Sequence, residues 1–322
     1  MKIFVTGGAG FIGSNYVHWL LANSDDSVVV YDALTYAGNR ANLAALEGNP
    51  RYSFVHGDIC DRDMVRAAMA GCDAVVHFAA ESHVDRSIAG SDVFIRTNCQ
   101  GTNVMCDIAR EHEVQRFLHI STDEVYGSIE VGSFTESDRL GPRSPYSASK
   151  AGSDLIALSH HTTYGLPVVV TRCSNNFGPY QFPEKVIPLF TTNLLDGKKV
   201  PLYGDGGNIR DWIHVWDHNT AADLVLRVGN IGEVYNIGAG NEITNRELTH
   251  RLLTLCGRDE SFIEPVADRL GHDRRYSVDC SKVEALGWKP AHELEEALAA
   301  TVGWYRDNRA WWEPLKARAA LA

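Results

Sequence analysis

The chain has 322 residues, of which 44% are hydrophobic and 22% are charged, and its formal net charge is −11 at pH 7. This composition excludes a disordered or fibrous protein, and the length suits one large α/β unit or a cofactor domain with a smaller second lobe. The acidic balance argues against nucleic acid and anionic membranes as partners. We therefore expect an anionic ligand to bind in a local pocket that supplies fixed hydrogen-bond donors.

Residues 1–5 lead directly into a glycine turn, and no apolar stretch approaches the length that spans a bilayer. We therefore expect a cytoplasmic protein without a signal peptide or a membrane helix. The seven cysteines form no Cys-x-x-Cys pair, and the 13 histidines show no zinc-binding spacing. The sequence predicts reduced cysteines and no bound metal.

The first half of the chain alternates short β-branched runs with segments of helical apolar spacing. This alternation is typical of a parallel sheet with helices on both faces. The predicted strands are 2–6, 27–32, 52–56, 74–78, 116–121 and 167–172. The predicted helices between them are 11–23, 62–70, 93–111 and 145–164.

After residue 172 the sequence changes to short elements rich in glycine, proline and asparagine, followed by two amphipathic helices expected at 245–256 and 294–308. The sequence thus predicts an α/β fold: a Rossmann-type doubly wound parallel sheet with a smaller, loop-rich α/β substrate lobe. The Rossmann domain is expected in residues 1–174, with a returning segment at about 212–238. The second lobe is expected in residues 175–211 and 239–322.

Gly7, Gly10 and Gly13 lie directly after the first predicted strand and open the first predicted helix. Glycines at this place let the backbone approach a pyrophosphate, which the free N–H groups and the helix dipole stabilise. The alternative interpretation is a tight turn without a ligand. Asp32 favours the interpretation as a ligand site. It ends a buried strand run about 20 residues beyond Gly13, where dinucleotide folds hold the adenosine ribose. Its charge would repel a 2′-phosphate, so NAD is favoured over NADP.

Two further strand ends suit the same cofactor. Asp58 and Ile59 follow the third predicted strand and can contact the adenine edge. Ala79 and Ala80 follow the fourth predicted strand and let the backbone pass close to the ligand.

Tyr146 and Lys150 are four residues apart on a predicted helix, so both side chains face the same side. A lysine cation beside a phenol, together with a positive nicotinamide, favours the phenolate and lowers the pKa of the tyrosine toward that of a general base. The alternative for this spacing alone is a solvated helix face. The preceding nucleotide fold favours the catalytic interpretation.

Thr122, Asp123 and Glu124 follow the fifth predicted strand, at the edge where open α/β sheets place their active sites. Two adjacent carboxylates at such a position cost free energy, so we expect them to have a function. The alternative is a helix cap made by Thr122 or Asp123, with Glu124 in solvent.

The glycine spacing resembles that of the extended short-chain dehydrogenase/reductase family. Several segments are similar to motifs of the dTDP-glucose 4,6-dehydratases within it: 80–87, 121–127, 175–180, 183–185, 210–212 and 271–276. Leu270 departs from the family pattern, which usually has proline before Gly271. The resemblance covers nearly the whole chain.

This resemblance implies a three-stage reaction on a nucleotide hexose. Tyr146, hydrogen-bonded by Thr122, takes the proton of the 4-hydroxyl while NAD receives the C4 hydride. Glu124 then removes the C5 hydrogen, and protonated Asp123 donates to the departing 6-hydroxyl. The hydride finally returns to C6.

The resemblance also implies a set of binding residues. Expected cofactor contacts, besides Tyr146, Lys150 and the residues named above, are Phe11, Ile12, Ala33, Leu34, Thr35, Phe78, Ser82, Thr97 and Asn176. Expected nucleotide-sugar contacts are Ser82, Thr122, Asn175, Lys185, Val186, Pro201, Tyr203, Arg210, Asn245, His272, Arg275 and Tyr276. Arg210 and Arg275 are expected to hold the diphosphate, because a guanidinium meets phosphate oxygens in a bidentate fork.

The family resemblance further implies a homodimer formed through the predicted helices 93–111 and 145–164. Two alternatives to the dehydratase stay open at this point. A nucleotide-sugar 4-epimerase or decarboxylase would share the cofactor site, Tyr146 and Lys150, without needing Asp123 and Glu124. A catalytically silent NAD-sensing protein would leave all four side chains idle.

Overall fold

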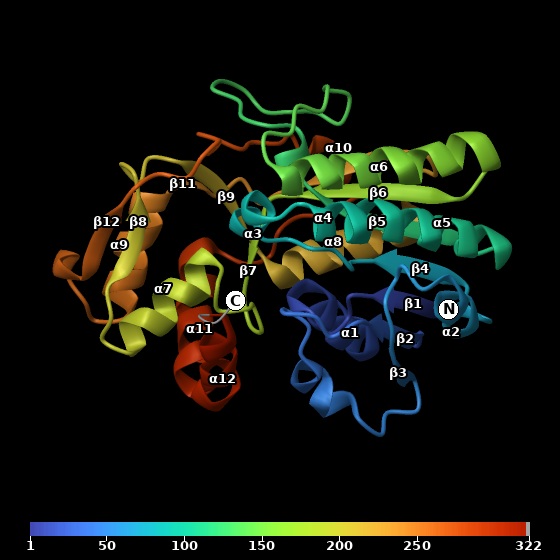
Figure 1. Ribbon diagram of the computed structural model, residues 1–322, viewed down its shortest axis with the longest axis horizontal. Coiled ribbons are helices and arrows are strands. Elements are labelled where there is room, and N and C mark those ends of the chain that lie inside the picture. Colours follow the sequence, from blue (N-terminus) through green and yellow to red (C-terminus); the bar gives the residue numbers. More distant parts are fainter. Residues whose placement is uncertain (320–322) are drawn as a thin grey trace.

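The computed structural model describes residues 1–319 and contains a seven-stranded sheet with helices on both faces (Figure 1). Its strands are β1 (Lys2–Thr6), β2 (Ser27–Asp32), β3 (Tyr52–His56), β4 (Ala74–His77), β5 (Arg116–Thr122), β6 (Val168–Cys173) and β10 (Val234–Ile237). All neighbours are parallel, in the order β10-β6-β5-β4-β1-β2-β3. This order confirms the predicted doubly wound sheet. It reverses between β1 and β4, the point at which such sheets bind ligands.

Two apolar cores lie on the two faces of this sheet. The flanking helices are α1 (Phe11–Asn23), α2 (Arg62–Met69), α5 (Thr102–Glu111), α6 (Pro145–Tyr164) and α8 (Val215–Val228). Ile3 and Val5 lie in the core with α1 and α8, whereas Phe4 lies in the core with α2, α5 and α6. Successive strand residues point to opposite faces, so a continuous apolar run supplies both cores.

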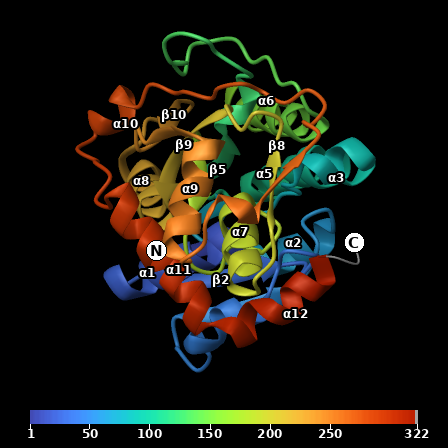
Figure 2. The same ribbon diagram turned by 90° about the vertical axis from the view of Figure 1, so that its left-hand side faces the viewer.

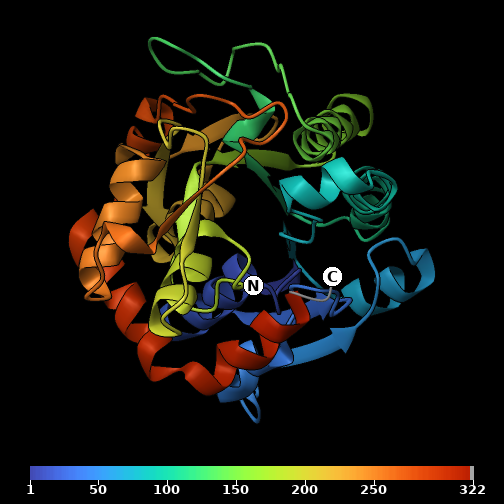
Figure 3. The ribbon, with the colours of Figure 1, turned by 60° about the vertical axis from the view of Figure 1, so that its left-hand side comes forward.

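A smaller lobe follows the large sheet along the chain and lies across from α5 and α6, as its yellow and orange segments show in Figure 3. Its strands are β7 (Asn175–Phe177), β8 (Val200–Tyr203), β9 (Ile209–His214), β11 (Glu242–Thr244) and β12 (Ile263–Val266). They form a three-stranded sheet β11-β9-β7 and a two-stranded sheet β12-β8. The helices α7 (Val186–Leu195), α9 (Asn245–Leu255) and α11 (Leu294–Asp307) complete a third apolar core (Figure 2).

Short helices connect these parts. They are η1 (Arg40–Leu46), α3 (Val84–Ala89), α4 (Asp92–Phe94), η2 (Ile95–Gly101), η3 (Asp123–Val125), η4 (Glu260–Phe262), α10 (Ser281–Glu284) and α12 (Arg309–Ala319). The sequence did not indicate α12, which contains Pro314 and buries Trp312. The chain returns to the large sheet with α8 at Val215, because β9 belongs wholly to the small sheet.

The helix predicted at 93–111 is not continuous. The structure has a π-helical segment, η2, before α5. There the buried Asn98 accepts a hydrogen bond from Glu81 N at 2.8 Å and donates to Glu81 O at 3.0 Å. A Cβ at Gly101 would lie 2.4 Å from Ile59 Cδ1. The wider helical turn therefore serves contacts with the loop after β4 that sequence periodicity does not reveal.

Across residues 1–319, no helix is long and apolar enough to cross a membrane. All seven cysteines are free thiols.

A buried ion pair joins α6 to β6. Arg172 Nε lies 2.9 Å from Asp154 Oδ2, and these side chains are 4% and 0% exposed. Burial alone would raise the pKa of Asp154, but the neighbouring His119 side chain, 3.4 Å from Asp154 Oδ1, and the charge of Arg172 hold it below its usual value. Arg172 also donates to the Tyr126 hydroxyl at 2.8 Å, just beyond the turn that carries Asp123 and Glu124. One guanidinium therefore fixes two elements of the site described below.

We predict that Asp154→Ala lowers the free energy of unfolding by about 3–5 kcal/mol, because Arg172 would stay buried without its partner. The loss should be present above about pH 4 and should shrink as the pH falls through the depressed pKa of Asp154, since protonation then removes the pair from the parent protein as well. Urea unfolding, monitored by circular dichroism at several pH values, measures both the loss of stability and its dependence on pH. Asp63→Ala is the control, because its pair with Arg66 leaves the aspartate 93% exposed. A loss as small for Asp154→Ala as for the control would contradict the assigned role.

Candidate active site

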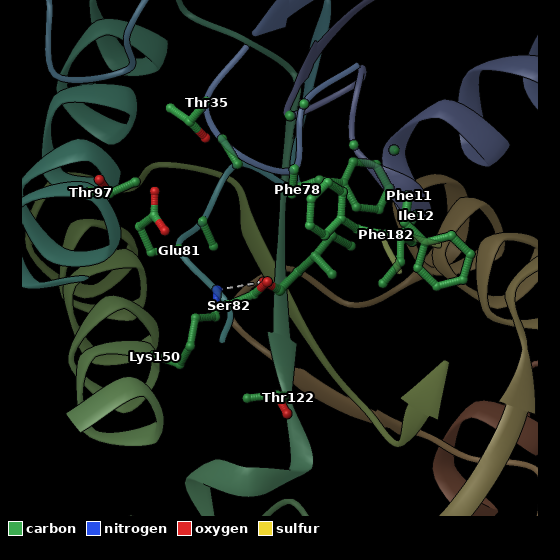
Figure 4. A pocket seen from close by; sticks show the side chains of 18 of the residues that line it. Phe11, Ile12, Thr35, Phe78, Glu81, Ser82, Thr97, Thr122, Lys150 and Phe182 are labelled. Atoms are coloured by element: carbon green, nitrogen blue, oxygen red, sulfur yellow. Dashed lines mark hydrogen bonds between the residues drawn. The ribbon is translucent and has the colours of Figure 1, made fainter. Parts of the chain in front are cut away.

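Two adjoining cavities lie where the large sheet meets the smaller lobe. The first has a volume of about 360 Å³ and follows the carboxyl ends of β1, β2, β4 and β5 (Figure 4). The second, of about 200 Å³, lies between α7, β8 and the segment 269–276. Four residues line both cavities and mark their junction: Glu124, Asn175, Glu184 and Lys185.

The glycine turn forms one end of the first cavity. Gly7 has a φ of +67°, and a Cβ there would lie 2.6 Å from Ala79 N. A Cβ at Gly13 would lie 2.3 Å from Gly7 O. The helix α1 begins after Gly10 without a side-chain cap, so its first backbone N–H groups are free to bind an anion. The turn therefore fits a pyrophosphate.

Asp32 ends β2 at the rim of the same cavity. Its carboxylate accepts hydrogen bonds from Ala9 N at 2.9 Å and Leu34 N at 2.8 Å, which fix its orientation. In residues 1–319 it forms no ion pair with a lysine or an arginine. A carboxylate held in this way fits a ribose diol and disfavours an added phosphate.

The structure brings nearly all of the expected cofactor residues to this cavity. It is lined by Gly7, Gly10, Phe11, Ile12, Gly13, Asp32, Ala33, Thr35, Asp58, Ile59, Phe78, Ala79, Ala80, Ser82, Thr97, Tyr146, Lys150 and Asn176. Leu34 is the one expected cofactor residue that does not line the cavity. Its side chain packs against the core on the α1 side.

Tyr146 and Lys150 enter the cavity from the first turns of α6. The helix begins at Pro145 after a capping box formed by Ser144 and Ser147. The Lys150 ammonium donates to Ile120 O at 2.8 Å. The two side chains thus face β5, as the four-residue spacing predicted.

The pKa of Tyr146 differs from the sequence-based expectation. Burial raises it well above its usual value, the neighbouring Glu124 carboxylate raises it further, and the side chain of Thr122 opposes them. Burial lowers the pKa of Lys150. Lys150 alone therefore does not favour the phenolate, and the positive nicotinamide of a bound cofactor is needed to supply the missing charge.

Asp123 and Glu124 lie in η3, directly after β5. The side chain of Asp123 is 3% exposed, and its Oδ2 has no hydrogen-bond partner among the described residues. Burial and the neighbouring charge of Glu124 raise the pKa of Asp123 well above its usual value. Burial also raises the pKa of Glu124, but Lys185, Arg210 and Arg269 oppose that rise. The pair therefore favours a protonated Asp123 beside an ionised Glu124.

The second cavity holds most of the expected nucleotide-sugar residues. Those that line it are Asn175, Lys185, Val186, Pro201, Tyr203, Arg210, Asn245, His272 and Tyr276. Ser82 and Thr122 line the first cavity instead. Arg210 lies over the Tyr276 ring, 4.1 Å from its centroid, and donates to Asp273 O at 2.9 Å.

Arg275 does not reach either cavity, contrary to the sequence-based prediction. Its guanidinium donates to Glu242 at 2.7 and 2.9 Å and to Gly132 O at 2.8 Å. Neighbouring side chains of an extended segment point to opposite sides, so Tyr276 in the cavity places Arg275 outside it.

Arg269 also lines the second cavity, although no sequence motif indicated it. It contacts Asp85 at 2.6 Å and lies 5.4 Å from the centroid of the Tyr203 ring. Its position depends on the fold of the loop 267–273. The motif that contains His272 was the only indication that this loop approaches the site.

Comparisons with known proteins agree with this geometry. A family model described as GDP-mannose 4,6 dehydratase matches residues 4–301. The chain is 57% identical to a dTDP-glucose 4,6-dehydratase of Streptomyces antibioticus, over 99% of this chain and 97% of that protein. The crystal structure of DesIV, a dTDP-glucose 4,6-dehydratase of Streptomyces venezuelae with NAD and dTDP bound, has a TM-score of 0.97 at 58% identity, covering 98% of this chain and 100% of the other. A UDP-glucuronic acid 4-epimerase of Bacillus cereus, in complex with UDP-glucuronic acid and NAD, has a TM-score of 0.90 at 28% identity, covering 95% and 99%.

We predict that the protein binds NAD far more tightly than NADP. A phosphate placed about 4 Å from the Asp32 carboxylate costs about 4 kcal/mol in a partly buried site, which corresponds to a roughly thousandfold difference in affinity. Titration of cofactor-free protein with both dinucleotides measures the ratio, and Asp32→Asn should reduce it. Equal affinities in the parent protein would mean that Asp32 does not face the ribose.

Proposed function

This chain belongs to the dTDP-glucose 4,6-dehydratase family of NAD-dependent nucleotide-sugar epimerases and dehydratases, and we propose that it converts dTDP-glucose to dTDP-4-keto-6-deoxyglucose. C4 is oxidised, water is eliminated across C5 and C6, and C6 is then reduced. Bound NAD supplies the hydride acceptor for C4 and the hydride donor for C6, so it is regenerated in every cycle. The enzyme is therefore a lyase (EC 4.2.1.46).

The adjacent carboxyl groups of Asp123 and Glu124 are the observation that carries this proposal. They lie at the edge of the first cavity, which Tyr146 and Lys150 also line. A 4-epimerase or a decarboxylase uses the same cofactor turn and the same tyrosine and lysine. Only the elimination needs both an acid for the 6-hydroxyl and a base for the C5 hydrogen.

Tyr146 takes the proton of the 4-hydroxyl in the proposed mechanism. The side chain of Thr122 lowers the pKa of the phenol and so favours its ionised form. Lys150 is held by Ile120 O on the same face of α6 and contributes its positive charge to the site. The product of this step, a 4-ketone, acidifies the hydrogen at C5.

Glu124 then acts as the base at C5, and Asp123 acts as the acid at the 6-hydroxyl. The cations around Glu124 favour its ionised form, whereas burial keeps Asp123 protonated. The two environments thus give adjacent groups of the same chemical type opposite tasks.

Arg210 and Arg269 are proposed to bind the substrate diphosphate in the second cavity. Both guanidinium groups line it, and both reduce the pKa shift of Glu124 at the junction. Tyr203 offers a ring to the nucleotide base. Residues 1–174 and 212–238 are proposed to bind NAD, and 175–211 and 239–322 the nucleotide sugar.

We further propose that the enzyme is a cytoplasmic homodimer. Two large apolar side chains on the predicted contact helices support the dimer: Ile95 and Leu155 are 51% and 60% exposed. A second copy of the chain would bury them.

We predict that Glu124→Gln completes the first oxidation but stalls before elimination, because Tyr146 and NAD are intact while the C5 base is lost. Overall turnover should fall by about 10²–10⁴-fold. Incubation with dTDP-glucose, with NADH followed by absorbance and products by mass spectrometry, should show NADH and the 4-keto hexose accumulating. Glu130→Gln, at an exposed position, is the control. Normal formation of the 6-deoxy product by Glu124→Gln would assign the base elsewhere.

We also predict that Arg210→Ala weakens dTDP binding by about 1.5–3 kcal/mol, the usual loss for a hydrogen bond to a charged group. NAD binding should not change, since Arg210 does not line the first cavity. Calorimetry with each ligand separates the two effects. Arg275→Ala is the matched control and should leave dTDP affinity unchanged. The reverse result, with loss only in Arg275→Ala, would show that Arg275 and not Arg210 holds the diphosphate.

A further inference from the structure

The C-terminal helix α12 is fixed to the smaller lobe by polar contacts at both of its faces. Its cations Arg309 and Lys316 bind Asp196, directly after α7, with N–O distances of 2.5 and 2.9 Å. Trp312 is 1% exposed, and its indole N–H donates to Tyr305 O of α11 at 2.7 Å. The helix therefore moves with the smaller lobe, although it lies beside the blue segment that follows β2 (Figure 2).

Trp311 makes the contact between α12 and that segment. Its indole Nε1–H donates to Asn42 Oδ1 at 2.9 Å. Asn42 is 2% exposed, and its Nδ2 donates to Ala9 O at 2.9 Å. The indole can only donate and the Ala9 carbonyl can only accept, so the orientation of the amide between them is fixed. One side-chain amide thus joins the C-terminal helix to the glycine turn.

Ala9 lies within the glycine turn and is held at both of its backbone polar groups. Its N–H donates to Asp32 Oδ2 at 2.9 Å. Its carbonyl accepts from the Asn42 side chain and from Asn39 N, the latter at 3.0 Å. Ala9 is 0% exposed, so water cannot replace these partners. An unbroken chain of hydrogen bonds therefore runs from Trp311 to Asp32, the carboxylate proposed to hold the adenosine ribose.

The position of this turn matters because backbone N–H groups bind an anion only when they point at it. Gly10 follows Ala9 directly, and α1 begins after it without a side-chain cap. Without the indole N–H, Asn42 Oδ1 would be buried and unpaired, which costs more free energy than an ordinary hydrogen bond contributes. The amide would then turn toward another partner and release Ala9 O, and the turn would lose its fixed position.

We propose that Trp311 is a positioning residue for NAD, which braces the glycine turn through Asn42. This inference rests on the proposed NAD site in the first cavity. None of the described residues of α12 lines either cavity. The helix thus contributes to cofactor binding without contacting the cofactor, and it links the smaller lobe to the affinity of the large one for NAD.

Trp311→Phe tests this role, because it keeps an aromatic ring and removes the N–H donor. NAD affinity should fall by about 3- to 10-fold, the size of one lost hydrogen bond, whereas dTDP affinity should not change. Calorimetry on cofactor-free protein measures both ligands. Trp312→Phe is the matched control, because it removes the same donor from the same helix but breaks a bond to α11. Urea unfolding should show a similar loss of stability in both variants, with NAD affinity unchanged in Trp312→Phe.

Asn42→Leu is a second variant, which keeps a similar side-chain volume, adds no charge and removes the donor to Ala9 O. It should weaken NAD binding at least as much as Trp311→Phe. Adding Trp311→Phe to it should cause no further loss, because the indole acts only through Asn42. Unchanged NAD affinity in either single variant overturns the proposal. So do equal losses of NAD affinity in Trp311→Phe and Trp312→Phe, or losses that add in the double variant.

The parent protein keeps the possible failures apart. If it does not bind NAD, the cofactor site is rejected and the brace with it. Formation of the 4-keto-6-deoxy product from dTDP-glucose, scored in the same preparations, tests the dehydratase function separately, since NAD affinity is measured without the sugar.

Discussion

Exclusion of water at the carboxyl end of β5 determines how the catalytic side chains ionise. In water, Asp123 and Glu124 would both be ionised at neutral pH and could not act as acid and base. Burial raises the pKa of both, and the cations near Glu124 then separate them. The same burial raises the pKa of Tyr146, so the phenolate depends on the positive cofactor ring. Burial is thus the common cause of the acidic role of Asp123, the basic role of Glu124 and the dependence of the Tyr146 phenolate on the cofactor.

The fold produces this buried cluster by joining three elements. β5 ends at Thr122, η3 follows immediately, and α6 presents Tyr146 and Lys150 against them. Arg172 holds the arrangement together, because it contacts Asp154 on α6 and the Tyr126 hydroxyl after η3. A charge outside the cavity therefore helps to set distances between groups inside it. The cavities proposed for the substrate and the cofactor meet at Glu124 and Lys185.

The sequence predicted the parts of this arrangement that have local signals. Short β-branched runs predicted β1, β2 and β3 with the observed bounds, and the glycine turn and Asp32 lie where a dinucleotide fold requires them. The π-helical segment η2 was missed, because it results from Asn98 contacting a loop distant in sequence. Arg275 was predicted to hold the diphosphate because it lies within the motif 271–276, whereas Arg269 lies outside that motif and had no local signal. Only the tertiary fold decides which guanidinium faces the cavity.

In the proposed reaction, one site oxidises C4 and later reduces C6 with the same hydride. The most direct test uses dTDP-glucose carrying deuterium at C4, with the product analysed by nuclear magnetic resonance and mass spectrometry. We expect deuterium in the C6 methyl group and solvent hydrogen at C5. A product that keeps deuterium at C4 and retains its 6-hydroxyl would contradict the account and identify a 4-epimerase.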